Sequence, residues 1–309
     1  MALNLVHFGD VHFPGVLRGW DARDIFSKKL VGLVNVKLLG RGRSFRHANA
    51  IVEAMLTDIR LSPPDAMIFS GDATMLALPL EFDNAAARLG VRDPELPPGF
   101  AVPGNHDYYT LRSGRSGDFE RAFAPWQRGE HLAGQLYPFA HRVGHVWLIG
   151  VNSAHQRHGL GASGKIGSAQ LNRLRTLCAG LAPGLRLLVT HYPLRNARGE
   201  LEGASHRLLD HAAALTAARD CGIALWLHGH IHKPFVLTPT AAIPFPIICC
   251  GSATQTHHRV YNRYRIEGSK LRMTRREYDP DTGAFRDGER VELELGDGPA
   301  AVNRPAGPW

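Results

Sequence analysis

The sequence has few cysteines, no long apolar run and no recognisable leader. Only 4 of its 309 residues are Cys, and their spacing is neither CxxC nor regular, which argues against a disulfide framework and favours buried free thiols in a reducing compartment. No stretch approaches about 18 uninterrupted apolar residues, so we expect no membrane-spanning helix. The first residues, MALNLVHFGDVHF, lack a basic segment and a long apolar segment. We therefore expect no secretory signal and a cytoplasmic location.

Acidic side chains are also fewer than basic ones. The 36 Lys and Arg against 28 Asp and Glu give a net charge of +8, which favours an anionic partner such as a phosphate-bearing substrate, a nucleic acid or an acidic membrane surface. A hydrophobic content of 44% and a charged content of 21% exclude global disorder. The 17 histidines raise the expectation of a metal site, because histidine is the commonest metal ligand.

Short apolar runs alternate with helix-like segments along most of the chain. This alternation predicts a mostly parallel sheet, in which polar residues past the carboxyl ends of the strands gather along one edge. We predict strands at 3–8, 66–70, 99–103, 145–151, 185–190 and 223–228, and helices at 47–60, 79–90, 168–179 and 206–219. Alternating runs over 234–279 predict antiparallel strands, and the Gly, Pro and Asp of 280–309 predict an irregular tail. Without a repeat or linker, we predict one domain over 1–309.

Five predicted strands end in residues that commonly bind metals. In the DxH and HxH segments, alternation would place both side chains on the same side of an extended chain. Carboxylate, amide and imidazole ligands suit Mn, Fe, Zn, Ni or Co. One tetrahedral zinc needs about three or four ligands, so a larger set predicts two ions that share a carboxylate and clamp a phosphoryl group. The seven candidates are Asp10, His12, Asp72, Asn105, His191, His230 and His232.

The ordered motifs D-x-H, G-D, G-N-H-D, H and G-H-x-H, spread over residues 9–232, resemble the calcineurin-like metallophosphoesterase superfamily. The resemblance implies an α/β fold, an α/β/β/α sandwich of two mixed β-sheets flanked by helices. It also implies hydrolysis of a phosphodiester, phosphomonoester or pyrophosphate bond by a metal-bridging hydroxide at two divalent or trivalent ions, for which Mn, Fe and Zn stay open.

The resemblance assigns a role to each motif residue. One metal would be bound by Asp10, His12 and His232, and the other by Asn105, His191 and His230, with Asp72 bridging them. His106 would face the substrate as a transition-state stabiliser or proton donor. Asp107 would orient His106 through a hydrogen bond.

Residues beside the motifs keep two interpretations. Tyr108 and Tyr109 follow GNHD and either line the pocket or pack in the core. Asn152 and Ser153 follow a predicted strand and lie either at the edge of the site or in a turn. His228 precedes the last motif and is interpreted as structural.

The motifs leave the substrate open. The segment SGDATMLAL at residues 70–78 lacks the Arg of the GDxVDRG-like sequence in protein Ser/Thr phosphatases. GNHD has His106 where the common lipid-A-pathway hydrolases typically have Arg. Bacterial cyclic-nucleotide phosphodiesterases share GNHD and GHxH, so a cyclic-nucleotide phosphodiesterase stays an alternative, as does a nuclease. A non-catalytic, partner-binding scaffold is an alternative of another class, against which the complete ligand set argues.

A basic insertion follows the first motif. Residues 17–46 carry eight Lys and Arg against two Asp, and apolar residues recur beside them at helix-like spacing. This pattern is typical of a basic amphipathic helix at a membrane surface or a partner. We expect Lys28, Lys29, Arg41 and Arg43 at the rim of the site, near a small, lipid-linked or nucleotide-linked phosphate substrate, with peripheral contact to an anionic inner membrane surface. The alternative is a cap helix with solvated charges.

A second basic run, 259–276, precedes an acidic run, 277–297. We expect the two runs to pair as neighbouring strands or to form a solvated face. Tyr261 and Tyr264 are the aromatics among these bases, which is a weak pattern for nucleic-acid binding, so nucleic acid is not the expected partner. The sequence leaves the oligomeric state open.

Overall fold

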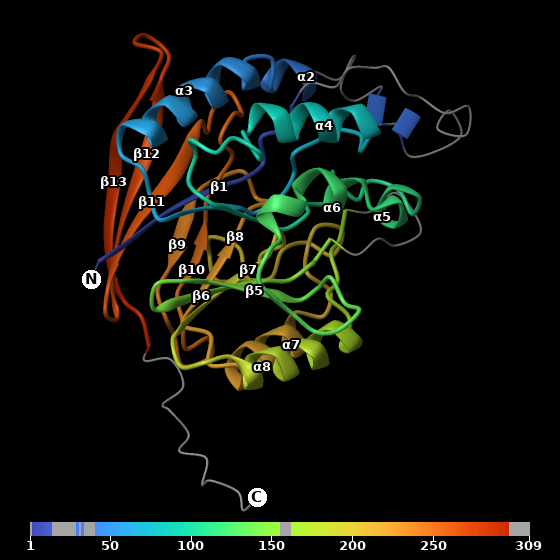
Figure 1. Cartoon of the computed structure of the whole chain (residues 1–309), viewed down its shortest axis with the longest axis vertical. Helices are drawn as coiled ribbons and strands as arrows, with labels where there is room; N and C mark the ends of the chain where they lie inside the picture. The colour runs from blue at the N-terminus through green and yellow to red at the C-terminus, as the bar shows by residue number, and fades with distance from the viewer. Residues whose placement is uncertain (1, 14–28, 31, 34–40, 155–161, 297–309) are drawn as a thin grey trace, which may run out of the picture.

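The fold is a sandwich of two mixed β-sheets with helices on the outer faces (Figure 1). The structure, a computed structural model, describes residues 2–13, 29–30, 32–33, 41–154 and 162–296. This architecture confirms the two-sheet α/β fold that the resemblance implies. It replaces the single, mostly parallel sheet that alternation alone predicts.

The first sheet has a parallel half and an antiparallel half. Its strands, in spatial order, are β13 (Ala284–Glu294), β12 (Lys270–Asp279), β11 (Val260–Glu267), β1 (Leu3–Phe8), β2 (Ala66–Phe69) and β3 (Gly99–Ala101). Strands β1, β2 and β3 are parallel to one another, whereas β11 to β13 join by antiparallel pairing. The carboxyl ends of β1 to β3 therefore open on one edge.

The second sheet also has a parallel centre. Its order is β4 (Glu130–His131), β5 (Phe139–Val143), β6 (Val146–Gly150), β7 (Leu185–Val189), β8 (Leu225–His228), β10 (Ile247–Cys249) and β9 (Phe235–Leu237). Strand β10 pairs parallel with β8 and antiparallel with β9. The antiparallel prediction for 234–279 is confirmed for the β9–β10 and β11–β12 pairs. The parallel partner of β10, β8, precedes that segment.

Helices cover both outer faces (Figure 1). On one side lie α2 (Arg41–Ser44), α3 (Ala48–Leu61) and α4 (Pro79–Arg88), followed along the chain by the short α5 (Ser113–Ser116), α6 (Asp118–Phe123) and 3₁₀ turn η2 (Ala124–Trp126); on the other lie α7 (Ser168–Gly180) and α8 (His211–Asp220). Helix α3 buries Ile51, Met55 and Ile59, the helical spacing that predicted it.

Helix α8 begins five residues later than predicted. The backbone before it is already used in extended pairing: the N–H groups of Ala162 and Gly164 donate to the carbonyls of Ser205 and Arg207 at 3.0 and 3.1 Å. The N–H of Leu209 likewise donates to the Gly164 carbonyl at 2.9 Å and is not available for a helical i→i−4 bond, so the regular helix starts at His211.

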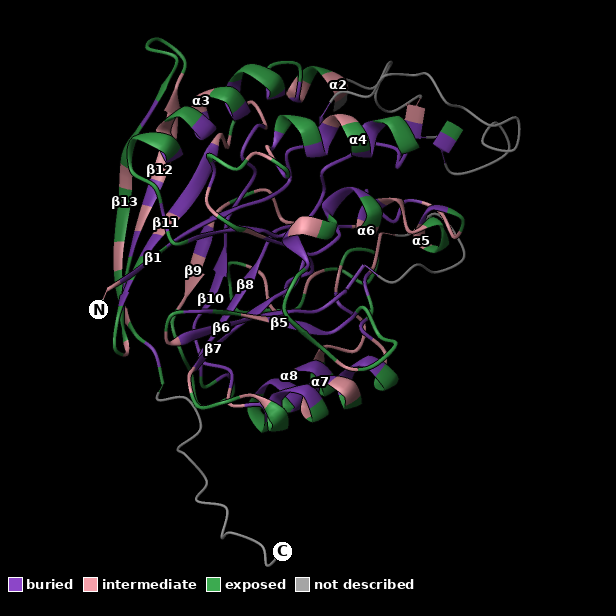
Figure 2. Ribbon diagram, in the orientation of Figure 1, coloured by how far each residue is buried: buried purple, intermediate pink, exposed green. Residues whose placement is uncertain are grey.

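The core lies between the sheets and beneath the helices. Figure 2 shows the central strands buried, whereas β13 and the outward faces of the helices are largely exposed. Leu5, Ile68, Phe100, Leu187 and Leu227 are each at most 1% exposed in the inter-sheet cluster, and each such side chain contributes about 1.5–3 kcal/mol on burial. The four cysteines are buried and free, as predicted.

The predicted irregular tail is wrong over residues 284–294, which form β13. Of the Gly, Pro and Asp that favoured a tail, only Pro280, Asp281 and Gly283 lie in the hairpin turn between β12 and β13, and most of the others follow β13. The acidic residues of β13 lie opposite basic ones. Arg272 Nε lies 2.9 Å from Glu292 Oε1, and Arg275 pairs with Glu289. The prediction that the basic and acidic runs form neighbouring strands is thus confirmed. Residues 297–309 lie outside the described residues.

Much of the basic insertion, including Lys28, also lies outside the described residues. Arg41 opens α2, and Arg43 is exposed. Lys29 is only 4% exposed, and its charge acts on the buried carboxyl of Glu81. The expectation of an exposed rim is therefore wrong for Lys29. In the described part of the chain, none of the helices has both the length and the apolar character needed to cross a bilayer.

Candidate metal centre

The strand ends bring all seven predicted ligands together at one edge of the sandwich. Asp10 and His12 follow β1, and Asp72 and Asn105 follow β2 and β3. The remaining ligands follow β7 and β8, which are parallel to each other: His191, His230 and His232. The carboxyl ends of two parallel half-sheets thus meet at one place, which is where ligands bind in sheets of this kind.

A first group of side chains surrounds His12. Asp10, His12, Asp72 and His232 each offer one ligand atom, and these atoms lie within 4.8 Å of one another. His12 Nε2 lies 3.2 Å from His232 Nε2 and 3.4 Å from Asp72 Oδ2. His232 Nε2 lies 3.2 Å from Asp10 Oδ1. Asp10, His12 and Asp72 are at most 1% exposed.

A second group surrounds Asn105. Its Oδ1 lies 3.0 Å from His191 Nε2 and 2.8 Å from His230 Nδ1, and the two imidazole nitrogens are 3.3 Å apart. His191 Nε2 also lies 3.5 Å from Asp72 Oδ2. The same carboxylate oxygen is thus near a histidine of each group, which is the position that a bridging ligand requires.

The outer nitrogens of these rings fix their protonation. Nδ1 of His12 lies 3.1 Å from the Thr74 carbonyl, and Nδ1 of His191 lies 2.8 Å from the Ser70 carbonyl. A carbonyl oxygen can only accept, so each of these nitrogens carries a proton and donates it. His230 donates from Nε2 in the same way, to the His206 carbonyl at 3.0 Å, and Nδ1 of His232 lies 3.0 Å from Gln255 Oε1.

The inner atoms of the cluster are consequently acceptors that face acceptors. Burial lowers the pKa of His191, which keeps its ring neutral and leaves a lone pair on Nε2. Neutral imidazole lone pairs 3.2–3.3 Å apart, beside carboxylate oxygens, repel one another unless cations lie between them. The donor set therefore fits two metal ions, and the carbonyl contacts are those that orient metal-binding histidines.

Backbone strain is concentrated at the same place. Among the described residues, six non-glycine residues have positive φ, and five of them are candidate ligands: Asp10 (52°), His12 (41°), Asp72 (62°), His230 (70°) and His232 (62°). Conformations of this kind cost on the order of 1–3 kcal/mol each and persist at functional sites. The strained backbone conformation thus orients these five side chains toward the cluster.

Two glycines allow the strand ends to approach closely. A Cβ on Gly104 would collide with the carboxylate and backbone of Asp72, and a Cβ on Gly229 would collide with the Asp10 carboxylate. The backbone N–H of His230 then donates to Asp10 Oδ2 at 3.0 Å. The absence of a side chain at these two glycines therefore allows the carboxylates of Asp72 and Asp10 to occupy their positions.

His106 lies beside the first group and lines one cavity with residues of both groups. Its ring meets that of His12 edge to face, with centroids 4.8 Å apart, and stacks on Tyr109 at 5.2 Å. Its Nδ1 lies 2.7 Å from the Met75 carbonyl. A cavity of about 360 Å³ is lined by His106 together with Asp72, Asn105, His206, His230, His232, Gln255 and His258. A substrate in this cavity would touch His106 and the candidate ligands at once.

The predicted role of Asp107 is wrong. Its carboxylate accepts from the backbone N–H groups of Asp72, Thr74 and Gly104 at 2.9–3.0 Å, so it fixes the loop that carries Asp72. The Met75 carbonyl and the Tyr109 ring orient His106 in its place. Asp107 precedes Tyr108 in a tight turn, and its carboxylate points toward the loop after β2.

The sequence did not reveal several residues of the site. Gln255 and His206 contact the ligand histidines, and His258 lines the cavity, but none belongs to a motif. The His206 contact is made by a main-chain carbonyl, which carries no sequence signal. His228 is fully buried in the core, where desolvation lowers its pKa to about 4, in agreement with a structural role.

A two-sheet α/β sandwich whose strand ends converge on a cluster of metal-ligand side chains defines the class of this protein. The family model described as calcineurin-like phosphoesterase matches residues 3–234. The chain therefore belongs to the calcineurin-like phosphoesterase family, as the motifs predicted. The search of curated proteins gave no match.

Solved structures share the fold. A dimetal phosphatase from Danio rerio is 12% identical, with 95% of this chain and 99% of that chain covered and a TM-score of 0.63. Purple acid phosphatase PPD1 from yellow lupin (Lupinus luteus) is 14% identical, with 95% and 54% covered and a TM-score of 0.60. GAP50, the anchor in the inner membrane complex of Plasmodium, is 11% identical, with 96% and 90% covered and a TM-score of 0.58. At these identities the likeness concerns the fold.

Proposed function

We propose that this chain is a metal-dependent phosphoesterase that hydrolyses a phosphodiester, phosphomonoester or pyrophosphate bond at a dinuclear site. The observation that carries the proposal is the cluster of mutually facing acceptors at the strand ends, next to a cavity lined by His106. Metal ions between these acceptor atoms would offset both their mutual repulsion and the backbone strain of the ligand residues.

Each ligand has a place in this proposal. Asp10, His12 and His232 would hold one ion, Asn105, His191 and His230 would hold the other, and Asp72 would be shared between them. Bound ions would neutralise the phosphoryl oxygens and make a water acidic enough to serve as the nucleophile. Mn, Fe and Zn all suit these ligands. The carbonyls of Thr74, Ser70 and His206 keep the rings aimed inward.

His106 acts on the leaving group in this proposal. Water adds to phosphorus, the bond from phosphorus to the leaving oxygen breaks, and that oxygen takes a proton. Because Nδ1 of His106 is engaged with the Met75 carbonyl, we assign the proton transfer to Nε2. Stacking on Tyr109 holds the ring in the orientation that this transfer needs.

A direct test is hydrolysis of bis(p-nitrophenyl) phosphate with added Mn²⁺, Fe²⁺ or Zn²⁺. We expect turnover by the wild type and a loss of about 10²–10⁴-fold in His106→Ala, the range for a general acid. Asp72→Ala should lose activity as well. His131→Ala, which removes an exposed histidine on β4, is the matched control and should retain activity. An inactive wild type with all three metals would favour the scaffold alternative. A preference for cyclic nucleotides would identify a cyclic-nucleotide phosphodiesterase, and a preference for DNA would identify a nuclease.

The basic insertion supports a second, separate proposal, peripheral contact with an anionic membrane that carries a lipid-linked substrate. Its support is the charge of residues 17–46 and the exposure of Arg43. Flotation with vesicles containing anionic lipid should recover the wild type, and a variant with Lys28, Arg41 and Arg43 changed to Gln should stay in the bottom fraction. Equal recovery of both proteins would instead support the cap-helix alternative, which the burial of Lys29 already favours at that residue.

A further inference from the structure

A second cavity, of about 640 Å³, is connected to the candidate metal centre through the chain. Two chain segments connect the regions. Tyr108 lines the cavity three residues after the candidate ligand Asn105. Asn152 also lines it and precedes Ser153, whose Oγ accepts the backbone N–H of His191 at 3.1 Å. Of the four residues with two interpretations in the sequence, Tyr108 and Asn152 thus line this cavity.

The cavity is rich in positive charge. Arg115, Lys165 and Arg173 line it, against a single acid, Glu120. Glu120 is engaged by neutral groups, because its Oε1 accepts the hydroxyls of Tyr108 at 2.5 Å and Tyr137 at 3.1 Å. Within the described residues, no ion pair joins any of the three cations to a carboxylate.

Hydrogen bonds place the segments that carry two of these cations. The Lys165 N–H donates to the Ser153 carbonyl at 2.9 Å, which ties Lys165 to the residue that holds His191. Arg173 Nε donates to the Tyr137 carbonyl at 3.1 Å. Arg115 lies on α5, whose segment follows the GNHD motif. The cations therefore come from three segments and converge on one hollow.

The start of α7 adds to this field. Ser168 and Ala169, its first residues, line the cavity, and this end of the 13-residue helix has no side-chain cap. Free N–H groups and the helix dipole favour an anion there. The Asp210 carboxylate accepts the N–H groups of Ile166 and Gly167 just before the helix, but Asp210 does not line the cavity.

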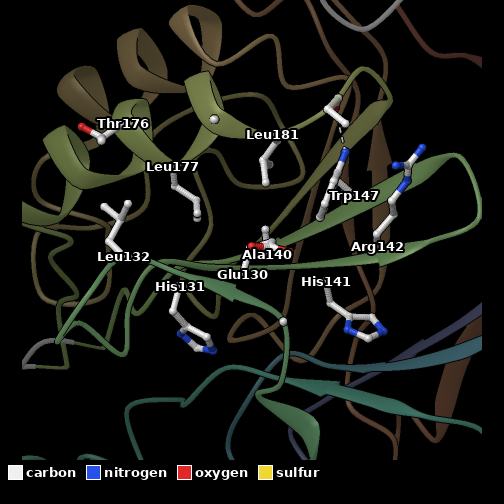
Figure 3. Close-up of a pocket in the computed structure, with 13 residues that line it drawn as sticks. Glu130, His131, Leu132, Ala140, His141, Arg142, Trp147, Thr176, Leu177 and Leu181 are labelled. Carbon is white, nitrogen blue, oxygen red and sulfur yellow. Dashed lines mark hydrogen bonds between the residues drawn. The ribbon is translucent and has the colours of Figure 1, made fainter.

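A cavity elsewhere in the molecule shows the contrast. It has a volume of about 670 Å³ and lies between α7 and the strands β4 to β6, lined by Leu177, Leu181 and Trp147 (Figure 3). Its cation, Arg142, stacks 5.5 Å over the Trp147 ring, whose Nε1 donates to the Ala182 carbonyl. No candidate metal ligand lines that cavity, and nothing in it selects an anion.

We propose that the cationic cavity beside the metal centre binds a second phosphate of the substrate, so that the natural substrate is a phosphoester carrying a further phosphate. This inference rests on the proposed function for the location of the scissile bond. The rings of Tyr108 and Tyr137 and the side chain of Leu136, which is 42% exposed, contact the organic part between the two phosphates.

The test uses two substrates that differ by one phosphate, p-nitrophenyl thymidine 5′-phosphate with and without a 3′-phosphate. Both release p-nitrophenolate when the same bond is hydrolysed. We expect the 3′-phosphate to lower KM by about tenfold or more, as charge-assisted contacts do. In the double variant Arg115→Gln/Lys165→Gln the ratio of the two KM values should fall to about one.

A control variant with the same loss of charge, Arg88→Gln/Arg128→Gln, changes exposed residues outside the cavity and should keep the wild-type ratio. Equal KM values in the wild type, or the same drop in both double variants, would overturn the proposal. The second outcome would show that net charge, rather than this cavity, attracts the substrate.

A binding measurement separates this inference from the proposed function. Calorimetry on the full chain in EDTA compares thymidine 3′-phosphate with thymidine, so it needs neither metal nor turnover. Tighter binding of the phosphate that disappears in Arg115→Gln/Lys165→Gln supports the subsite even if neither ester is hydrolysed, in which case the proposed function alone fails. Equal affinities for the two compounds would overturn the subsite while leaving the hydrolase proposal intact.

Discussion

Two regions of the molecule are dense in polar side chains: the edge, where strand ends carry the candidate metal ligands, and the ladder, formed by the antiparallel strands β11, β12 and β13. The environment of these side chains differs between the two regions. At the edge, side chains such as Asp72 and His191 are buried, the backbone is strained, and acceptors face acceptors. In the ladder, Arg272 and Glu292 face each other at the surface across an antiparallel pair. The charges of the ladder are paired within the protein, whereas the cluster at the edge has the composition of a metal site. The difference shows which polar groups serve the fold and which serve a ligand.

The largest effect is expected from a substitution that displaces the candidate ligands at the edge without removing any of them. Gly104→Ala places a Cβ against the Asp72 carboxylate, so we expect loss of metal binding and of at least about 10²-fold in activity, the scale for misplaced reacting groups. Activity and metal content measure it. Gly180→Ala is the control, because a Cβ there meets nothing within 4 Å, and it should behave as wild type. Full activity in Gly104→Ala would show that the close approach of the two loops is dispensable.

A second prediction concerns the stability of the edge. If cations relieve the repulsion there, saturating metal should raise the melting temperature, by an amount that corresponds to about 2.7 kcal/mol per ion at a hundredfold excess over Kd. Asp72→Ala should show a much smaller rise, because both groups lose a ligand. Calorimetric scans with EDTA or Mn²⁺ measure the difference. An identical rise in the variant would place the binding elsewhere.

The smallest effect belongs to the ladder. Arg272→Glu should cost about 0.2–1 kcal/mol, the usual worth of an exposed ion pair, since the two side chains are 55% and 76% exposed. Combining it with Glu292→Arg should recover most of that loss, and neither change should alter activity. Urea denaturation curves provide the values. A loss of several kcal/mol in the free energy of unfolding would show that the ladder depends on this ion pair far more than its exposure predicts.

The two regions were also unequally readable from the sequence. The ligand residues could be predicted because their type and their place after buried strands are local features. Other features depend on loops that are distant in sequence, and no local pattern predicts them. They are the positive φ of Asp10 and His12, the contact of Gln255 with His232 and the hydrogen bonds of Asp107. Composition predicted an irregular tail where β13 lies, whereas the charge pattern predicted that residues 277–297 pair with the basic run.

The most direct test of the account is the number of metal ions bound per chain, measured by elemental analysis after reconstitution and dialysis. The account predicts two ions in the wild type and at most one in Asp72→Ala. One ion in the wild type, or none, would contradict the dinuclear site on which the proposed chemistry depends.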